Sequence, residues 1–242
     1  MKIDTNNYVF DIDGTLTPSR GKISEDFKHF FLEWMEGKNV YFVTGSDKNK
    51  TVEQIGEEIW NKATRCYQSC GNAVYEKGKL IRQLDFPLSK KLDELLREFL
   101  LWSQWTERYT TNIEPRIGLI NFSVIGRDCP QEARDKYAKW DNKTKERLAF
   151  CDIIHEKFPE LEASVGGQIS IDIYLKGKNK SQILKDISGP VIFFGDKCKP
   201  GGNDFPIVDY LFHEGLTDYT RKYKVHEVTD YKDTWSVLTQ DY

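Results

Sequence analysis

Close to its start the chain carries the stretch Tyr8-Val9-Phe10-Asp11-Ile12-Asp13-Gly14-Thr15. An apolar, β-prone run that ends abruptly in acid and glycine is typical of a buried strand that meets a functional loop. Two more apolar runs, residues 40–43 and 191–194, are followed by Gly45-Ser46 and Gly195-Asp196. Stretches of helical periodicity follow the first two runs. The order strand, helix, strand, helix predicts an α/β fold with a parallel sheet and right-handed crossovers.

From about residue 83 the pattern changes. A helix after Ser89, strands within residues 117–125, a helical stretch over 131–158 and a strand over 168–174 are expected. These elements predict an α+β domain, with helices on one face of an antiparallel sheet. We therefore expect an α/β core formed by residues 1–82 and 177–242, interrupted by an inserted domain over 83–176. Within the returning core a short helix over 181–187 is expected.

The composition and net charge of the chain argue against several classes of function. The 242 residues include 35 Lys+Arg and 38 Asp+Glu, so the net charge of −3 argues against a nucleic-acid partner. No apolar run approaches the roughly 20 residues of a membrane span, and a soluble chain is expected. Five scattered cysteines predict neither a disulfide framework nor a zinc site. A reducing, cytoplasmic location is the expectation.

Acidic residues follow two of the predicted core strands. In an open parallel sheet, ligands bind beyond the carboxyl ends of the strands, which would bring Asp11, Asp13 and Asp196 to one edge. Three carboxylates repel one another unless a cation neutralises them, and oxygen ligands suit Mg²⁺. One aspartate could act as nucleophile while another handles protons. The alternative interpretation of a single Asp-x-Asp-Gly motif is a solvated turn.

Two further residues strengthen the catalytic interpretation. The Ser46 hydroxyl and neighbouring amides could hold phosphoryl oxygens, and Lys180 could supply a positive charge to the same group. Each alone is explained as readily by a helix cap or a solvated lysine. In chain order, Asp11-x-Asp13, Ser46, Lys180 and Gly-Asp196 resemble the four-part signature of the haloacid dehalogenase superfamily. That resemblance implies a Rossmann-like core with an inserted cap domain.

A closer resemblance, to the eukaryotic-type phosphomannomutases, extends over almost the whole chain. It rests on Asp-Ile-Asp-Gly-Thr-Leu-Thr at 11–17 and on the stretches at 45–47, 114–127, 166–172 and 193–204. The resemblance implies that Asp11 is phosphorylated and that Asp13 is the general acid/base. It also implies Mg²⁺ held by Asp11, the Asp13 carbonyl and Asp196, with Asp204 supporting the metal.

The same resemblance implies a site for the sugar phosphate. The matching residues are Arg20 in the core and, in the inserted domain, Arg116, Arg127, Arg134, Ser170 and Asp172. Arginine forks suit a remote phosphate because they grip its oxygens bidentately. The alternative for the three inserted-domain arginines is pairing with surface acids such as Glu132 or Asp135, where exposed pairs contribute about 0–1 kcal/mol.

The function implied is interconversion of mannose 6-phosphate and mannose 1-phosphate through an aspartyl-phosphate and a hexose 1,6-bisphosphate, which also serves as activator. The product would supply GDP-mannose synthesis, and the enzyme would be a homodimer formed through the cap. A Mg²⁺-dependent sugar-phosphate phosphatase with the same nucleophile is the alternative, because residues 174–180 depart from the family pattern. A catalytically silent binding protein is the third hypothesis, and the retained motif residues argue against it.

Overall fold

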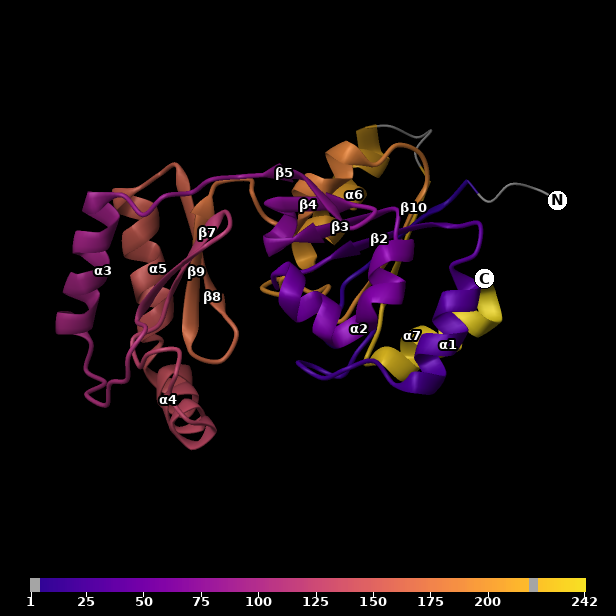
Figure 1. Ribbon diagram of the computed structural model, residues 1–242. Helices are drawn as coiled ribbons and strands as arrows, with labels where there is room; N and C mark the ends of the chain where they lie inside the picture. Colours follow the sequence, from indigo (N-terminus) through magenta and orange to yellow (C-terminus); the bar gives the residue numbers. More distant parts are fainter. Residues whose placement is uncertain (1–4, 218–221) are drawn as a thin grey trace. The chain divides into compact units, whose positions relative to one another are not determined.

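The computed structural model describes residues 5–217 and 222–242, which form two compact units (Figure 1). The core unit comprises Met1–Gln83 and Lys178–Tyr242, and the inserted unit comprises Leu84–Gly177. The limits expected from the sequence, 83 and 176, differ from those of the inserted unit by one residue at each end. Each unit has its own sheet and its own buried cluster of apolar side chains.

The core unit is built on a seven-stranded sheet in the order β11-β10-β1-β2-β3-β4-β5. The parallel strands are β11 (Tyr223–Glu227), β10 (Val191–Gly195), β1 (Asn7–Phe10), β2 (Asn39–Val43) and β3 (Arg65–Gln68). The antiparallel hairpin β4 (Ala73–Glu76) and β5 (Lys79–Gln83) completes one edge. Because β1 lies between β10 and β2, the residues that follow it lie between those that follow these two strands.

Helices cover both faces of this sheet because its strands are apolar on both sides. On one face Tyr8 and Phe10 pack with α1 (Glu25–Trp34), α2 (Lys48–Lys62) and α7 (Tyr231–Asp241). On the other face Val9 packs with α6 (Phe205–Thr217) and the 3₁₀ helix η2 (Lys180–Asp186). A second 3₁₀ turn, η1 (Ser69–Gly71), joins β3 to β4. This is the layered arrangement typical of parallel sheets.

The inserted unit is a four-stranded antiparallel sheet covered on one face by helices. Its order is β6-β7-β9-β8, with β6 (Ile113–Arg116), β7 (Leu119–Phe122), β9 (Ser170–Leu175) and β8 (Leu161–Gly166). The helices are α3 (Lys90–Trp102), α4 (Gln131–Thr144) and α5 (Glu146–Lys157). The stacked rings of Phe99 and Phe150, 4.1 Å apart, join α3 to α5. The predicted α/β fold, with a parallel core and an inserted α+β part, is confirmed.

Two expected helices differ from the structure. The stretch 131–158 is two helices, because Lys145 adopts a left-handed conformation with φ of 59° and ends α4. The expected helix at 181–187 is the 3₁₀ helix η2, which begins at Lys180. It ends at Asp186, because Ile187 adopts an extended conformation. In the part of the chain that is described, none of the helices combines the length and apolar character needed to cross a membrane.

A buried ion pair fixes the junction between α4 and α5. Asp141 and Arg147 are each 4% exposed, and the Arg147 Nε donates to Asp141 Oδ2 at 2.8 Å. The Arg147 backbone amide donates to the other carboxylate oxygen at 2.9 Å. The Arg147 Nη1 then donates to the carbonyl oxygens of Gly167 and Ser170. The pair therefore anchors the start of β9, which carries Ser170 and Asp172.

Substitution Asp141→Asn should destabilise the inserted unit strongly, because it leaves the Arg147 charge buried without its counter-ion. We expect a loss of about 3–5 kcal/mol in the free energy of unfolding. Urea titration followed by far-ultraviolet circular dichroism measures it. The control is Glu132→Gln on the same helix: its pair with Lys136 is exposed, so it should cost less than about 1 kcal/mol. Equal losses for the two variants would contradict this account of Asp141.

Candidate active site

Three neighbouring strands of the core sheet carry the residues expected for catalysis at their carboxyl ends. Asp11 follows β1, Asp196 follows β10, and Ser46 lies three residues beyond β2. The register pairs Phe10 with both Phe194 and Phe42, so the three strands end at one level. The Asp11 amide donates to the Phe194 carbonyl oxygen at 2.9 Å and continues the ladder to the site. The parallel sheet therefore places these loops side by side.

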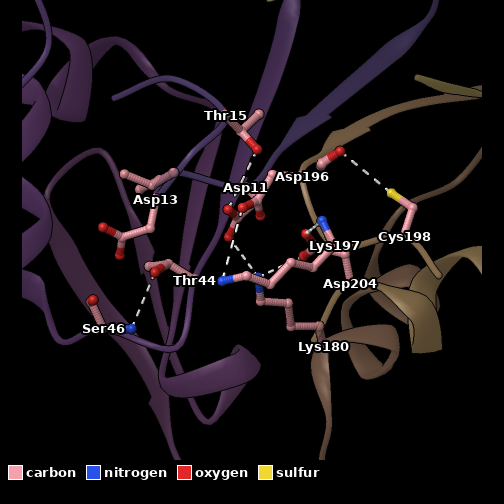
Figure 2. A network of polar contacts seen from close by, with 12 residues as sticks. Asp11, Asp13, Thr15, Thr44, Ser46, Lys180, Asp196, Lys197, Cys198 and Asp204 are labelled. Carbon is pink, nitrogen blue, oxygen red and sulfur yellow. Dashed lines mark hydrogen bonds and ion pairs between the residues drawn. The ribbon is translucent and has the colours of Figure 1, made fainter. Parts of the chain in front are cut away.

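A buried lysine lies at the centre of the site (Figure 2). The Lys180 side chain is 1% exposed, and its ammonium donates to Asp11 Oδ1 at 2.5 Å and to Asp204 Oδ1 at 2.7 Å. Asp204 is also held by the Lys197 amide at 3.1 Å. The Thr15 hydroxyl lies 3.5 Å from the second oxygen of Asp11. Lys180 thus links the nucleophile candidate to Asp204, and both carboxylates are oriented by donors.

This cluster has more carboxylates than ammonium groups and therefore carries excess negative charge. Burial raises the pKa of Asp11 to about 7 against the opposing influence of Lys180, and the charges of Asp204 and Asp196 add to the rise. Burial also raises the pKa of Asp196. Burial would lower the pKa of Lys180, yet the adjacent carboxylates of Asp11 and Asp204 raise it overall. Three carboxylates facing one buried ammonium leave room for another cation.

The donor set at this point fits a hard divalent cation. One carboxylate oxygen each from Asp11, Asp196 and Asp204 lies within 4.8 Å of the others. The Asp196 Oδ1 is buried and has no hydrogen-bond partner within residues 5–217 and 222–242. Gly14, with φ of +86°, lies against this carboxylate: a Cβ there would come 2.4 Å from Asp196 Oδ2. Oxygen ligands with one unused buried acceptor are suited to Mg²⁺.

Asp13 lies apart from this cluster. Figure 2 shows its carboxylate turned away from Asp11 and Asp196. Its Oδ1 accepts from the Arg20 backbone amide at 2.7 Å and from Gln54 Nε2 at 2.8 Å. The sequence analysis did not identify Gln54, which is 1% exposed on α2. The sequence offered one signal: Gln54 is polar and directly precedes Ile55, which lies on the apolar face of that helix.

Ser46 and Arg20 are less buried than the cluster. The Ser46 amide donates to the Thr44 hydroxyl at 3.1 Å, and its carbonyl oxygen accepts from the Ser69 amide at 2.9 Å. Its side chain is half-buried at the carboxyl end of the sheet. Arg20 is exposed and has a left-handed φ of 59°, in the loop that follows Thr17. The core unit therefore holds its expected site residues in the loops that follow β1, β2 and β10 and in η2.

The inserted unit gathers its own set of expected residues. The Arg127 Nη1 donates to the Ser170 hydroxyl at 3.1 Å. Arg134 donates to the backbone carbonyl oxygens of Cys129 and Arg127. Arg116 pairs with Glu114. These residues come from β6, β9, α4 and the loop after β7.

The surface acids suggested as alternative partners for these arginines pair elsewhere. Glu132 forms an ion pair with Lys136, and Asp135 accepts from the side-chain amides of Gln131 and Gln168. Neither of these two acids pairs with the three arginines in the described structure, and Arg116 pairs with a different acid, Glu114. The reason is geometric: Glu132 and Lys136 are four residues apart on α4 and meet on its surface.

Asp172 has a partner that the sequence analysis missed. Asn121 on β7 is directly opposite Asp172 on β9, and its Nδ2 donates to Asp172 Oδ1 at 2.5 Å. The next strand places Glu114 opposite Asn121. Burial raises the pKa of Asp172, whereas Asn121 and the charges of Arg116 and Arg127 oppose the rise. A polar row thus crosses three strands on the face of the sheet away from the helices.

Known proteins provide an independent comparison. A model of the eukaryotic phosphomannomutase family matches residues 27–237. The chain is 36% identical over 215 residues to a phosphomannomutase of Nicotiana benthamiana, covering 83% of this chain and 84% of the relative. It is 36% identical over 209 residues to that of Galdieria sulphuraria, covering 82% and 83%.

Solved structures show the same architecture. A haloacid dehalogenase-like hydrolase from Bacteroides thetaiotaomicron superposes with a TM-score of 0.64 at 13% identity, covering 98% of this chain and 99% of that one. At that identity the likeness establishes the fold. The family match over most of the sequence shows that this chain belongs to the eukaryotic phosphomannomutase family.

Proposed function

We propose that this protein is a phosphomannomutase that interconverts mannose 6-phosphate and mannose 1-phosphate. The observation that carries the proposal is the buried contact of Lys180 with Asp11, beside the carboxylates of Asp196 and Asp204. Asp11 would attack the phosphoryl group, and Asp13 would move the proton of the sugar hydroxyl. Lys180 and the Ser46 loop would bind the phosphoryl oxygens. The product would supply GDP-mannose synthesis.

Mg²⁺ is the cation proposed for the core site. The Asp11 carboxylate, the Asp13 backbone carbonyl and Asp196 would hold it, and Asp204 would support this shell. When bound, Mg²⁺ neutralises charge on the transferring phosphoryl group. The fit rests on the oxygen-only donor set and on the unused Asp196 Oδ1. The neighbouring Lys180 would remain paired with Asp11 and keep that carboxylate ionised for attack.

The inserted unit is proposed to act as the cap that binds the sugar and its remote phosphate. Arg116, Arg127 and Arg134 would hold the phosphate, while Ser170 and Asp172 would contact sugar hydroxyls, and Arg20 would contribute from the core. The support is that Arg116, Ser170 and Asp172 lie on strands of one sheet, and that the Arg127 guanidinium hydrogen-bonds Ser170. A hexose 1,6-bisphosphate would be both the intermediate and the activator.

A sugar-phosphate phosphatase with the same nucleophile is the second candidate. The observation in its favour is the run Tyr174-Leu175-Lys176-Gly177-Lys178-Asn179-Lys180, where the family usually has Phe-Pro-Asp-Gly-Trp-Asp-Lys. This stretch connects the inserted unit to the core unit. The two functions differ in whether the aspartyl-phosphate meets a sugar hydroxyl or water.

One assay distinguishes the two candidates. Purified protein with Mg²⁺, mannose 1-phosphate and a catalytic amount of hexose 1,6-bisphosphate should form mannose 6-phosphate much faster than free phosphate. Both products are measured in the same reaction. Release of phosphate without isomer would reject the mutase and favour the phosphatase, because water rather than sugar would then accept the phosphoryl group.

Substitution Asp11→Asn should abolish turnover, because the amide is a poor nucleophile and cannot form the aspartyl-phosphate. We expect kcat to fall by at least about 10⁴-fold. The rate of isomer formation measures the effect, and acid-labile ³²P on the wild-type protein should disappear in the variant. Asp26→Asn, an exposed change on α1, is the control and should keep the wild-type rate. Near wild-type turnover by Asp11→Asn would exclude this mechanism.

We further propose a cytoplasmic homodimer that assembles through the cap. All five cysteines are unpaired with one another, as a reducing compartment would leave them. Sedimentation velocity at micromolar concentration should show a species near twice the 28.3 kDa chain mass. A single species near 28.3 kDa would refute the dimer and leave the catalytic proposal intact.

A further inference from the structure

One carboxylate in the inserted unit lies between two of the proposed phosphate-binding arginines. Glu114, on β6, accepts a hydrogen bond from Arg116 Nε at 3.0 Å, and Arg116 Nη2 donates to the same oxygen, Oε2. That oxygen also lies 3.6 Å from Arg127 Nε. A single carboxylate oxygen thus joins both guanidinium groups. It takes the position that an oxygen of a bound phosphate would take.

The charges around this oxygen favour an anion. Burial lowers the pKa of Arg127, and repulsion from Arg116 and Arg134 lowers it further, whereas Glu114 and Asp172 act in the opposite direction. Three guanidinium groups therefore face two carboxylates. The cluster retains a positive charge even with Glu114 in place, and without Glu114 the surplus would match a phosphate dianion.

The inserted unit also holds two buried hydrogen-bonding atoms that have no partner among the described residues. Arg134 Nη1 is buried and has no acceptor among the residues that the structure describes. Asn121 is 2% exposed, and its Oδ1 is likewise buried without a donor in the described chain. A buried unpaired donor or acceptor is costly, so both atoms favour a ligand that completes them. Phosphate oxygens and a sugar hydroxyl supply the two missing partners.

We propose that Glu114 is an internal competitor of the sugar phosphate. Its carboxylate occupies the Arg116–Arg127 pair when phosphate is absent and weakens the hold of this pair on a bound phosphate. The inference rests on the proposed function, because isomerisation through a bisphosphate requires the arginines to release one phosphate and accept the other. A carboxylate attached to the site can replace the departing phosphate, so the two cations are never left facing each other alone. Glu114 is thus a positioning residue that sets the rate of phosphate exchange.

The test measures phosphate affinity separately from catalysis. Inorganic phosphate is titrated into the intact protein by calorimetry for wild type and for Glu114→Gln, which removes the charge at nearly constant size. We expect the dissociation constant at the inserted unit to fall about five-fold, the factor that corresponds to the stronger partly exposed pairs. In the isomerase assay KM and kcat should both fall, because tighter binding slows release.

Two controls assign the effect to the arginine pair. Glu162→Gln removes a charge of matched exposure from β8 of the same sheet and should leave phosphate affinity unchanged. In an Arg127→Leu background, Glu114→Gln should lose much of its gain, since one of the two guanidinium groups for which Glu114 and phosphate compete is absent. Glu114→Asp keeps the charge but shortens the side chain, so its affinity should lie between those of wild type and Glu114→Gln. Circular dichroism verifies that each variant is folded.

The outcomes are separable from those of the proposed function. Unchanged phosphate affinity in folded Glu114→Gln, or an equal gain in Glu162→Gln, would overturn the inference. A purely structural Glu114 would lower the melting temperature of the variant without lowering its KM, which would also overturn the inference. Five-fold tighter phosphate binding in a protein that forms no isomer would support competition at the arginines while rejecting the mutase function.

Discussion

The buried ammonium of Lys180 is the interaction on which the core unit and its chemistry both depend. Removing a charged group from water costs several kcal/mol unless it is paired and hydrogen-bonded, so Lys180 requires Asp11 and Asp204 on either side. The contact joins positions 169 residues apart in the chain, across the whole inserted unit. Strand β1 must therefore pair with β10 before the Lys180 ammonium can contact both carboxylates. The same contact keeps the nucleophile candidate in place.

Two aspartates separated by one residue are prepared for different tasks by their surroundings. Asp11 lies among charges that raise its pKa and is held by an ammonium. Asp13 is held by neutral donors, an amide nitrogen of the backbone and one of Gln54. The turn that separates them is tight, since the Ile12 carbonyl oxygen accepts from three later amides. Only a glycine fits at position 14, where φ is +86° and Asp196 lies within contact. Local backbone geometry thus gives the two carboxylates different surroundings, which suits the different roles proposed for them.

The sequence predicted those parts of the site that follow from strand ends, and missed those that depend on side-chain partners. A parallel sheet brings Asp11 and Asp196 together whatever the loops do, so pattern alone was sufficient. Gln54 was missed because a polar residue within a helix is ordinarily exposed. Glu114 was missed because its significance lies in its second contact, with Arg127, which only the folded chain brings near from the loop after β7. The break at Lys145 had no sequence signal, since a left-handed lysine is unfavourable by about 1–2 kcal/mol and is tolerated here because Asp141 and Arg147 fix the junction.

The two units carry opposite electrostatic imbalances, so the ligands proposed for them differ in charge. The core cluster has more carboxylates than cations, and the polar face of the inserted sheet has more guanidinium groups than carboxylates. A divalent cation satisfies the first, and a phosphate satisfies the second. A ligand that binds only the folded state stabilises it, so substrate and metal would relieve both imbalances at once. If the charges within a unit neutralised one another completely, the unit would be more stable, but it would no longer attract a charged ligand. Partial neutralisation, by Lys180 in one unit and Glu114 in the other, would leave the core charged enough to bind a cation, and the inserted unit charged enough to bind a phosphate yet weak enough to exchange it.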